Sequence, residues 1–319
     1  MKKTKIGQTD LEVSEFCLGT MPYGVKISGD EVDTLIDSFR GEGGNFFDAA
    51  HCYSFWAPCG DGASERALGR YMKKNGCRDS MVIATKGGHP GSGNYRKVER
   101  YLSPCRVEAD IDDSLGRLGI DVIDLYWLHR DDPREDVGAI LDTLNNEVKR
   151  GRIRYFGGSN WTAARLDEAN TYAAKHGIDG FVASQSRWSL LRYEEMSDEE
   201  RLKPGALLSV NGDDRRRHAD SQLPLVPYGP TGNGFFAMEG RAPEKFITPG
   251  NTERANRVVK LASELGATPG QVPLAWLKAQ PFPVIPILGT SSVEHLKDAL
   301  GAADVNLTRA QVTWLEKGE

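Results

Sequence analysis

Short apolar runs alternate with amphipathic stretches along almost the whole chain, and this alternation limits the possible folds more than any other feature. We expect strands at 16–20, 45–49, 81–86, 123–128, 153–157, 181–185, 224–228 and 283–288. We expect helices at 30–42, 63–74, 103–119, 137–150, 162–176, 252–265 and 292–300. Apolar strands separated by amphipathic helices imply a parallel sheet covered by helices. About eight such pairs favour an α/β fold of the closed (β/α)8, or TIM, barrel type over an open doubly wound sheet.

The remaining segments fit around this repeat. Residues 4–15 alternate polar and apolar side chains across a turn, which predicts a β-hairpin that caps the amino-terminal mouth of the barrel. Residues 269–279 and 308–317 have helical patterns outside the repeat. Residues 190–222 are polar and poorly periodic, with one short helix expected near 211–221. Because no linker or shift in composition divides the chain, we expect one domain over residues 1–319.

Charge and hydropathy argue against several classes of protein. The net charge is −5, so the chain lacks the basic surface that nucleic-acid binding needs. No stretch approaches the ~20 apolar residues of a membrane span. The basic start of the chain is not followed by the apolar core of a signal peptide. We therefore expect a protein that binds neither nucleic acid nor a membrane.

Cysteine usage indicates a reducing compartment. The five cysteines are scattered and form no Cys-x-x-Cys pair: Cys17, Cys52, Cys59, Cys77 and Cys105. This pattern fits reduced thiols in a cytoplasmic protein better than a disulfide framework. His51, Cys52 and Cys59 lie close together in the sequence, but they lack the spacing of a zinc site, so we expect no metal.

Four ionisable side chains stand at or just past the ends of consecutive expected strands: Asp48, Tyr53, Lys86 and His129. The carboxyl ends of parallel strands converge at one mouth of a barrel. There Lys86 would favour the phenolate of Tyr53 and lower its pKa from ~10, while Asp48 would keep Lys86 charged. Taken singly, Asp48, Lys86 and His129 could be a helix cap, a strand-end charge and a core histidine. Together with the tyrosine they predict an enzyme that uses a phenol as an acid near neutral pH.

The first strand is not followed by a conventional dinucleotide fingerprint. It ends in Gly19-Thr20-Met21-Pro22-Tyr23-Gly24, which lacks the Gly-x-Gly-x-x-Gly spacing. A Rossmann-type nucleotide site is therefore not expected.

Several short motifs follow one another at the expected strand ends. They are Phe47-Asp48-Ala49-Ala50-His51-Cys52-Tyr53, Gly62-Ala63-Ser64-Glu65-Arg66-Ala67-Leu68-Gly69, Thr85-Lys86, Ser114-Leu115-Gly116-Arg117-Leu118-Gly119, Gly157-Gly158-Ser159-Asn160-Trp161 and Gln185. In these motifs the chain resembles the aldo-keto reductases, from about Ile6 to Trp314. Each motif alone is moderately specific, and their common order makes the resemblance strong.

The resemblance implies a barrel enzyme that binds an extended nicotinamide dinucleotide and interconverts a carbonyl and its alcohol by hydride transfer. Tyr53 would be the general acid in reduction and the general base in oxidation. His129 would orient the substrate carbonyl, and Asp48 and Lys86 would complete the catalytic set.

The resemblance also implies a cofactor site. Ser159, Asn160 and Gln185 would hold the nicotinamide carboxamide, and Tyr228 would stack on the nicotinamide ring. The full implied set is Gly19, Thr20, Met21, Asp48, Ser159, Asn160, Gln185, Tyr228, Gly229, Pro230, Gly232, Asn233, Gly289, Thr290, Ser291 and His295. The glycines among them would let backbone approach a pyrophosphate closely.

NADP(H) is the expected cofactor because it is the family's usual one. Many relatives carry Lys or Arg near Ser292 and Asn at Ala299, and these grip the 2′-phosphate. Here the cationic candidates reduce to His295 and Lys297, and a phosphate without a bidentate arginine is held less tightly. NAD(H) or dual use therefore stays open.

A third group of residues is expected to contact a small-molecule substrate: Tyr23, Tyr53, Phe55, Trp56, His129 and Arg130. Where reductases of bulky apolar carbonyls often have an aromatic residue, this chain has Arg130. A polar pocket suits hydroxylated substrates, since buried polar groups need partners. Phe55 and Trp56 could pack against sugar rings, so a sugar or sugar-derived carbonyl is our working expectation.

Two other functions fit the same barrel. One is a nucleotide-binding regulatory protein similar to the β-subunits of potassium channels. The other is an aldolase or isomerase in which Lys86 forms a Schiff base. The direction of the reaction, the natural substrate and the oligomeric state are left open by the sequence.

Overall fold

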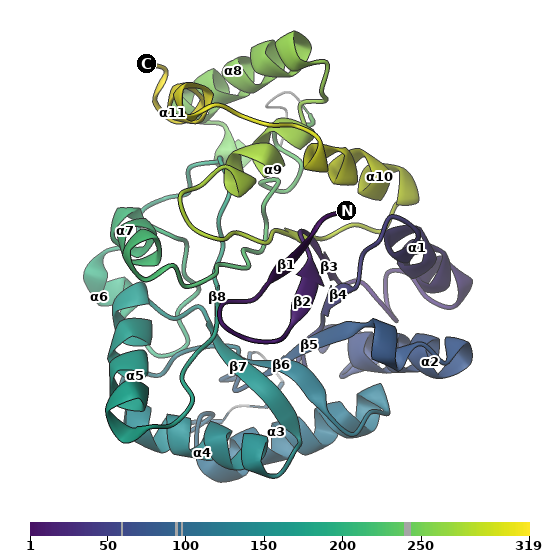
Figure 1. The fold of residues 1–319 in the computed structure, drawn as a ribbon, viewed down its shortest axis with the longest axis vertical. Coiled ribbons are helices and arrows are strands. Elements are labelled where there is room, and N and C mark those ends of the chain that lie inside the picture. The colour runs from purple at the N-terminus through teal and green to yellow at the C-terminus, as the bar shows by residue number, and fades with distance from the viewer. Residues whose placement is uncertain (59, 93–94, 97, 239–243) are drawn as a thin grey trace.

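The structure is a computed structural model that describes residues 1–58, 60–92, 95–96, 98–238 and 244–319. Its centre is a curled sheet of seven parallel strands in the order β8-β7-β6-β5-β4-β3-β9 (Figure 1). The strands are β3 (Cys17–Gly19), β4 (Phe46–Asp48), β5 (Val82–Gly87), β6 (Ile123–Leu128), β7 (Ile153–Ser159), β8 (Ser184–Gln185) and β9 (Ile287–Leu288). This parallel sheet agrees with the α/β architecture predicted from the sequence.

Helices surround the outside of the sheet (Figure 1). They are α1 (Asp30–Gly41), α2 (Ala63–Asn75), α3 (Pro104–Leu118), α4 (Val137–Lys149), α5 (Ala163–His176), α6 (Asp198–Arg201), α7 (Gly212–Ser221), α8 (Pro249–Leu265), α9 (Gln271–Lys278), α10 (Val293–Leu300) and α11 (Arg309–Lys317). The described residues also form short 3-10 helices, namely η1 (Arg78–Ser80), η2 (Glu244–Phe246) and η3 (Gly301–Ala303). Helices α8 and α11 pack against each other beyond the ring formed by the others.

The segment expected as the strand 224–228 is not a regular strand. It forms isolated parallel bridges from Leu225 to Ser184 on one side and to Val284 on the other, so it links the two ends of the curled sheet. The expected strand 283–288 is likewise reduced to β9. Prolines explain both differences, because Pro224, Pro227, Pro283 and Pro286 have no N–H to donate to a ladder.

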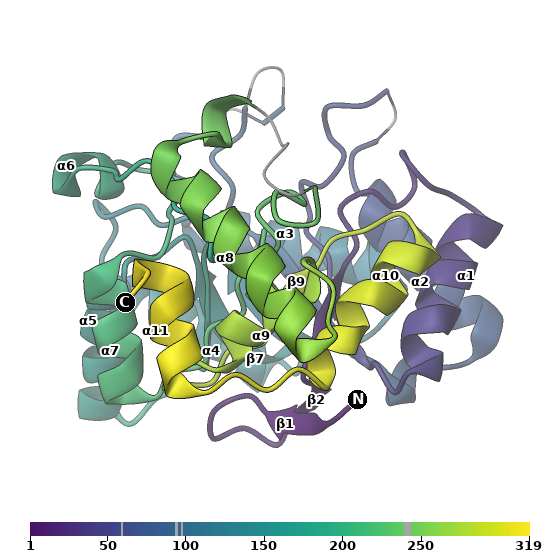
Figure 2. The same ribbon diagram turned by 90° about the horizontal axis from the view of Figure 1, so that it is seen from above.

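The predicted amino-terminal hairpin is present. Strand β1 (Lys3–Lys5) pairs with β2 (Glu12–Ser14) in antiparallel register. The Asn45 side chain, which precedes β4, accepts from Ser14 N at 2.7 Å and donates to the Glu12 carbonyl at 2.9 Å. The hairpin therefore lies across the amino-terminal end of the strands, at the bottom of Figure 2.

Both faces of the parallel strands are buried, as such sheets require. In β6, Leu125 and Trp127 pack inside the curl with apolar residues of the hairpin, including Val13. Their neighbours Tyr126 and Leu128 pack outward beneath the helices. The alternation with period two gives each strand an inner and an outer face.

The polar stretch 190–222 contains two helices. Helix α7 agrees with the short helix expected near 211–221, whereas α6 was not predicted. Both begin with a capping box, from Ser197 and Glu200 in α6 and from Asn211 and Asp214 in α7. The Ser-x-x-Glu spacing of α6 was a readable start signal. It was overlooked because the helix is too short to show periodicity.

Among the described cysteines, Cys17, Cys52, Cys77 and Cys105 are free thiols, and Cys59 lies outside the described residues. The described residues also contain no group of three or more His, Cys, Asp or Glu side chains that could hold a metal ion.

No helix within the described part of the chain has the length and apolar content to cross a membrane.

Two glycines in neighbouring helices predict opposite effects on stability. A Cβ at Gly69 in α2 would overlap the carbonyl oxygen of Leu118 at the end of α3, whereas a Cβ at Gly116 in α3 would have no neighbour within 4 Å. Gly69→Ala should therefore force the two helices apart and destabilise the fold by about 1–3 kcal/mol. Gly116→Ala should stabilise it by roughly 0.5–1 kcal/mol, because glycine is a poor helix former. Urea unfolding midpoints would test this pair, and equal midpoints would contradict the close packing of α2 on α3.

Candidate active site

Four of the predicted site residues share the inner face of the sheet. Asp48 follows the inward-facing Phe46 by two positions, and Lys86 likewise follows Ala84. His129 and Gln185 stand in the same relation to Trp127 and Ala183. Since side chains alternate along a strand, all four point into the same carboxyl-terminal mouth.

The ammonium group of Lys86 is the centre of the site. Its Nζ donates to Asp48 Oδ2 at 2.5 Å, to the Ala49 carbonyl at 2.7 Å and to the Tyr53 hydroxyl oxygen at 2.8 Å. An ammonium group has three hydrogens, so each is used. Because the Tyr53 oxygen accepts one of them, its own hydroxyl hydrogen is directed elsewhere and is available to a ligand.

Asp48 is held from two further sides. Its Oδ1 accepts from Gln185 Nε2 at 3.0 Å, and its backbone carbonyl accepts from the Thr20 hydroxyl at 3.1 Å. The side chains of Asp48 and Lys86 are both only 1% exposed. Removing one partner of such a buried ion pair leaves an uncompensated charge and costs about 3–5 kcal/mol. The pair is therefore fixed rigidly beneath Tyr53.

Burial affects the pKa of Tyr53 more than Lys86 does. It raises the pKa of Tyr53 to about 12, and the opposing effect of Lys86 does not reverse it. The expectation that Lys86 would bring this pKa below its ordinary value is wrong for the free protein, because withdrawal from water penalises the phenolate more than one paired cation favours it. Burial alone would lower the pKa of Lys86, but Asp48 and Tyr53 together raise it above its ordinary value.

His129 is neutral in this environment. Burial lowers the pKa of His129 well below its usual range, and the positive charges of Arg130 and Lys86 add to the effect. Its Nδ1 lies 3.3 Å from Cys52 Sγ. Burial also raises the pKa of the Cys52 thiol to about 12, so the sulfur keeps its hydrogen and can donate to Nδ1. The imidazole hydrogen would then sit on Nε2, where it can act as a donor.

The carboxamide candidates differ in how many bonding positions they have free. Asn160 uses all of its own: its Nδ2 donates to the His129 carbonyl and to Ser159 Oγ, and its Oδ1 accepts from Leu208 N and from the Tyr228 hydroxyl. The hydroxyl hydrogen of Ser159 and Oε1 of Gln185 have no partner within the described residues. A donor and an acceptor are thus free, as a carboxamide requires.

The other cofactor candidates fall into three groups by their position in the chain. Gly19 and Thr20 are buried, and the Thr20 hydroxyl is engaged with Asp48 and with Ser64 Oγ at 2.7 Å, whereas Met21 is 51% exposed. Gly229, Gly232 and Asn233 have positive φ angles of 64°, 59° and 57°, and with the buried Pro230 they form a tight loop next to Tyr228.

The third group lies where α10 begins. Gly289 and Ser291 are exposed, Thr290 is half-buried, and an added Cβ at Gly289 would meet nothing within 4 Å. Ser292 caps the helix by accepting from His295 N at 3.3 Å. The side chains of His295 and Lys297 are exposed and form no ion pair with a carboxylate of the described chain. These residues leave room for a charged group at the helix start.

Aromatic side chains gather beside His129. Phe55 stacks on Tyr95 with ring centroids 4.5 Å apart, and Trp56 meets the Phe55 ring edge-on at 5.3 Å. His89 lies between this group and His129, 5.1 Å from the imidazole of His129. Phe55, Trp56, His129 and Tyr53 are thus brought to one region, with Trp56 58% exposed.

Tyr23 is not part of this region. Its ring is 0% exposed and lies in the hydrophobic cluster that contains Phe16 and Leu18. A fully buried ring offers no surface to a substrate, so the structure gives no support to the predicted contact of Tyr23 with substrate.

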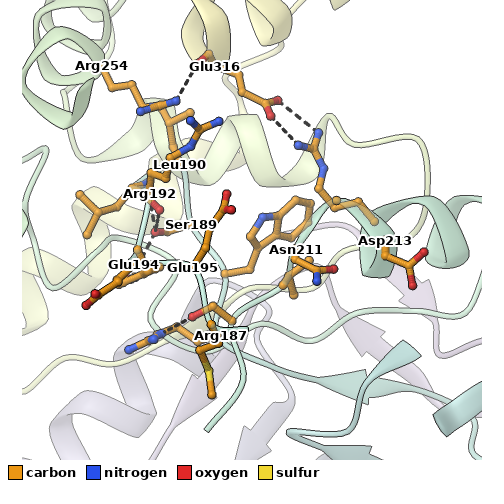
Figure 3. A pocket seen from close by; sticks show the side chains of 18 of the residues that line it. Arg187, Ser189, Leu190, Arg192, Glu194, Glu195, Asn211, Asp213, Arg254 and Glu316 are labelled. Carbon is orange, nitrogen blue, oxygen red and sulfur yellow. Dashed lines mark hydrogen bonds and ion pairs between the residues drawn. The ribbon is translucent and has the colours of Figure 1, made fainter. Parts of the chain in front are cut away.

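A separate cavity of about 420 Å³ lies between α7, α8 and α11 (Figure 3). Two of its guanidinium groups hold the carboxyl-terminal helix: Arg215 pairs with the Glu316 carboxylate, and Arg254 donates to the Glu316 carbonyl at 2.9 Å. None of the four catalytic candidates lines it. We therefore assign these contacts to the anchoring of α11.

Comparison with known proteins agrees with this geometry. The model of the Aldo/keto reductase family matches residues 15–318. The chain belongs to the aldo/keto reductase family. The resemblance drawn from the motifs is thereby confirmed, and it extends over nearly the whole chain.

Relatives in this family come from bacteria and fungi. The chain is 30% identical over 322 residues to "Uncharacterized oxidoreductase YrpG" of Bacillus subtilis, covering 97% of this chain and 93% of that protein. It is 30% identical over 326 residues to "Aldo-keto reductase yakc [NADP(+)]" of Schizosaccharomyces pombe, covering 97% and 88%. It is 29% identical over 328 residues to "Norsolorinic acid reductase B" of Dothistroma septosporum, covering 96% and 78%.

The structure also brings three further residues to the site. Cys52 contacts His129, and Tyr95 stacks on Phe55. His89 lies against the rings of Tyr95 and His129. Cys52 directly precedes Tyr53, so its closeness to the site could have been inferred. Tyr95 and His89 lie in a loop after β5 whose path the strand pattern does not determine.

Asp131, two residues after His129, predicts a pH dependence of stability. Burial raises the pKa of its carboxyl to about 7 despite the opposing effect of Arg165, and its Oδ1 has no hydrogen-bond partner. In the unfolded chain the pKa is ~3.9. The folded state therefore binds the proton more tightly, and its stability should fall as pH rises from about 4 to 7.

Asp131→Asn should remove most of this dependence, because the amide stays neutral. Urea midpoints at pH values on either side of that range should differ less for Asp131→Asn than for the wild type. Asp79→Asn, at an exposed position, is the matched control. An unchanged slope in the Asp131 variant would show that the carboxyl is already ionised throughout.

Proposed function

We propose that this protein is an NAD(P)-dependent oxidoreductase that interconverts a carbonyl and its alcohol by hydride transfer. Its one domain, residues 1–319, would be a complete (β/α)8 barrel in which segment 224–228 takes the place of the remaining strand. The observation that carries the proposal is the 2.8 Å contact from Lys86 Nζ to the Tyr53 hydroxyl oxygen. It leaves the phenolic hydrogen free to be donated in the mouth of the sheet.

Tyr53 is the general acid/base in this proposal. With a pKa of about 12, the phenol is fully protonated at neutral pH and is ready to donate to a carbonyl oxygen during reduction. The phenolate left behind lies against the ammonium of Lys86, which Asp48 keeps charged. Fixed charges that match the developing negative charge lower the barrier without reorganising. A bound nicotinamide supplies the hydride.

His129 orients the substrate. Its neutral ring and the Cys52 contact at Nδ1 support a hydrogen on Nε2, which can donate to the same carbonyl oxygen as Tyr53. Two donors converging on one oxygen fix the direction from which the carbonyl carbon is approached. Cys52 is then a positioning residue that holds one tautomer of His129.

NADP(H) is the proposed cofactor, and NAD(H) or dual use remains the alternative. The free donor of Ser159 and the free acceptor of Gln185 suit the nicotinamide carboxamide, with Asn160 holding the neighbouring backbone and Tyr228 in place. The loop from Gly229 to Asn233 and the start of α10 would accommodate the phosphates. The name of the Schizosaccharomyces pombe relative, which includes NADP(+), supports this order of preference.

The Schiff-base alternative is disfavoured by the state of Lys86. A nucleophilic amine must lose its proton, yet Asp48 and Tyr53 hold the pKa of Lys86 above its ordinary value and use all three hydrogens. A nucleotide-binding regulatory protein would have the same residues, so only a measurement of turnover distinguishes it from an enzyme.

The proposed substrate is a small carbonyl compound, sugar or sugar-derived, with Phe55 and Trp56 packing against its carbon face. The free thiols favour a cytoplasmic location, with no role for nucleic acid, membrane or metal. Steady-state rates across aldoses, keto-sugars and plain aromatic aldehydes would test the substrate class. A preference for plain aromatic aldehydes by orders of magnitude would count against sugars.

Tyr53→Phe tests the mechanism most directly. Removing the hydroxyl should lower kcat for NADPH-dependent carbonyl reduction by about 10²–10⁴-fold, the usual contribution of a general acid. Binding of NADPH, followed by its fluorescence, should change little, because Tyr53 has no proposed contact with the carboxamide. A wild-type protein that bound the nucleotide but reduced no aldehyde would favour the regulatory function. If Lys86→Met abolished a cofactor-independent reaction that Tyr53→Phe spared, the Schiff-base function would be correct.

Lys297→Ala tests the cofactor preference. If this exposed cation faces the 2′-phosphate, its loss should weaken NADPH binding by on the order of tenfold and leave NADH binding unchanged. Fluorescence titration with both nucleotides measures the two dissociation constants. Lys175→Ala, at an exposed position in α5, is the control, and equal effects on both nucleotides would remove Lys297 from the phosphate site.

A further inference from the structure

Arg130 is a charged side chain buried beside the catalytic candidates. It directly follows His129 at the carboxyl end of β6 and is 8% exposed. After burial, it is the strongest influence that lowers the pKa of both His89 and His129. Its positive charge also acts on the Cys52 thiol and on Tyr228. The guanidinium therefore lies among the groups that surround the mouth.

This guanidinium has no carboxylate partner in the described part of the chain. Its one hydrogen bond runs from Nη1 to the His129 carbonyl at 2.8 Å, although a guanidinium has five N–H donors. The two acidic residues that follow it face other arginines. Asp132 accepts from Arg134 at 2.8 and 2.7 Å, and Asp131 lies 3.5 Å from Arg165.

The unused donors of Arg130 are not sealed in the core. Its nitrogens do not appear among the described buried atoms that lack a hydrogen-bond partner, so they reach accessible space. A purely structural role, bracing the turn after β6 through the His129 carbonyl, would use one donor of five. Asn160 already donates to that same carbonyl at 3.1 Å. Bracing alone therefore does not account for a buried cation at this position.

The charges of the site do not cancel without a ligand. The charge of Lys86 is balanced by Asp48, and His129 is neutral. The positive charge of Arg130 has no counter-charge among the described residues. Buried charges in proteins are normally paired, since withdrawing an unpaired one from water is strongly unfavourable. A negative group that enters with a ligand would restore the balance, and the planar fork of arginine matches the two oxygens of a carboxylate or phosphate.

We propose that the substrate carries an oxyanion, a carboxylate or a phosphate ester, that pairs with Arg130 while its carbonyl oxygen meets Tyr53 and His129. This inference rests on the proposed oxidoreductase function and narrows its substrate to acidic or phosphorylated small carbonyl compounds. Arg130 directly follows His129 in the chain, and its charge acts on Cys52 and Tyr228 as well as on His129, which places both contacts in the same mouth. The aromatic group of Phe55, Tyr95 and His89 packs against the carbon atoms between them.

Matched pairs of aldehydes test the proposal. One arm compares glyceraldehyde 3-phosphate with glyceraldehyde, and the other compares succinic semialdehyde with butanal, so the two arms separate phosphate from carboxylate. In at least one arm, kcat/KM of the wild type should be higher for the anion by on the order of tenfold to a hundredfold. Arg130→Gln should abolish that preference, because kcat/KM should fall by about tenfold or more further for the anionic aldehyde than for its neutral partner. Arg134→Gln, at a nearby arginine that is already paired with Asp132, should leave the preference intact.

Binding supplies a readout that does not need turnover. Calorimetric titration of 4-hydroxybutanoate and of glycerol 3-phosphate should show an affinity that Arg130→Gln loses and Arg134→Gln retains. Equal rates for anionic and neutral aldehydes, or equal losses for both in Arg130→Gln, would overturn the inference and leave the oxidoreductase function standing. Weaker NADPH binding in Arg130→Gln with an unchanged substrate preference would assign Arg130 to the cofactor and also overturn it. Anion binding through Arg130 without reduction of any aldehyde would retain the inference and overturn the proposed function.

Discussion

The buried contact of Lys86 with Asp48 and Tyr53 is the constraint on which the site depends. An ammonium that is 1% exposed needs partners for all three hydrogens, and Asp48, Ala49 and Tyr53 supply the acceptors. Asp48 comes from β4, Lys86 from β5 and Tyr53 from the loop after β4, so the parallel pairing of the two strands sets the geometry. The freedom of the Tyr53 hydrogen follows from that pairing.

Charge balance then separates structural from functional groups. Arg134 and Arg165 are paired with Asp132 and Asp131, and Arg215 is paired with Glu316, which anchors the carboxyl-terminal helix. Arg130 has no such carboxylate partner among the described residues. On the proposed function, a site that neutralises Lys86 but leaves Arg130 unpaired would select the charge of its ligand as well as its carbonyl group.

The short edge strands show how composition shapes the sheet. The longest strands of the sheet, β5, β6 and β7, have six or seven residues. Prolines confine β9 to two residues and reduce the 224–228 segment to isolated bridges. The backbone of these two segments therefore forms fewer sheet hydrogen bonds. The loops that follow them contain the glycines proposed to approach the cofactor.

The sequence by itself determined the parallel α/β architecture, the hairpin and the inward direction of Asp48, Lys86 and His129. These follow from local periodicity, since a residue two positions after an inward apolar side chain points inward as well. Tertiary structure alone decided that burial outweighs Lys86 at Tyr53, that Tyr23 lies in the core, that Cys52 meets His129 and that Arg130 has no partner. Each of these depends on which distant segments exclude water from a group or supply its counter-charge, and such long-range packing leaves no periodic trace in the chain.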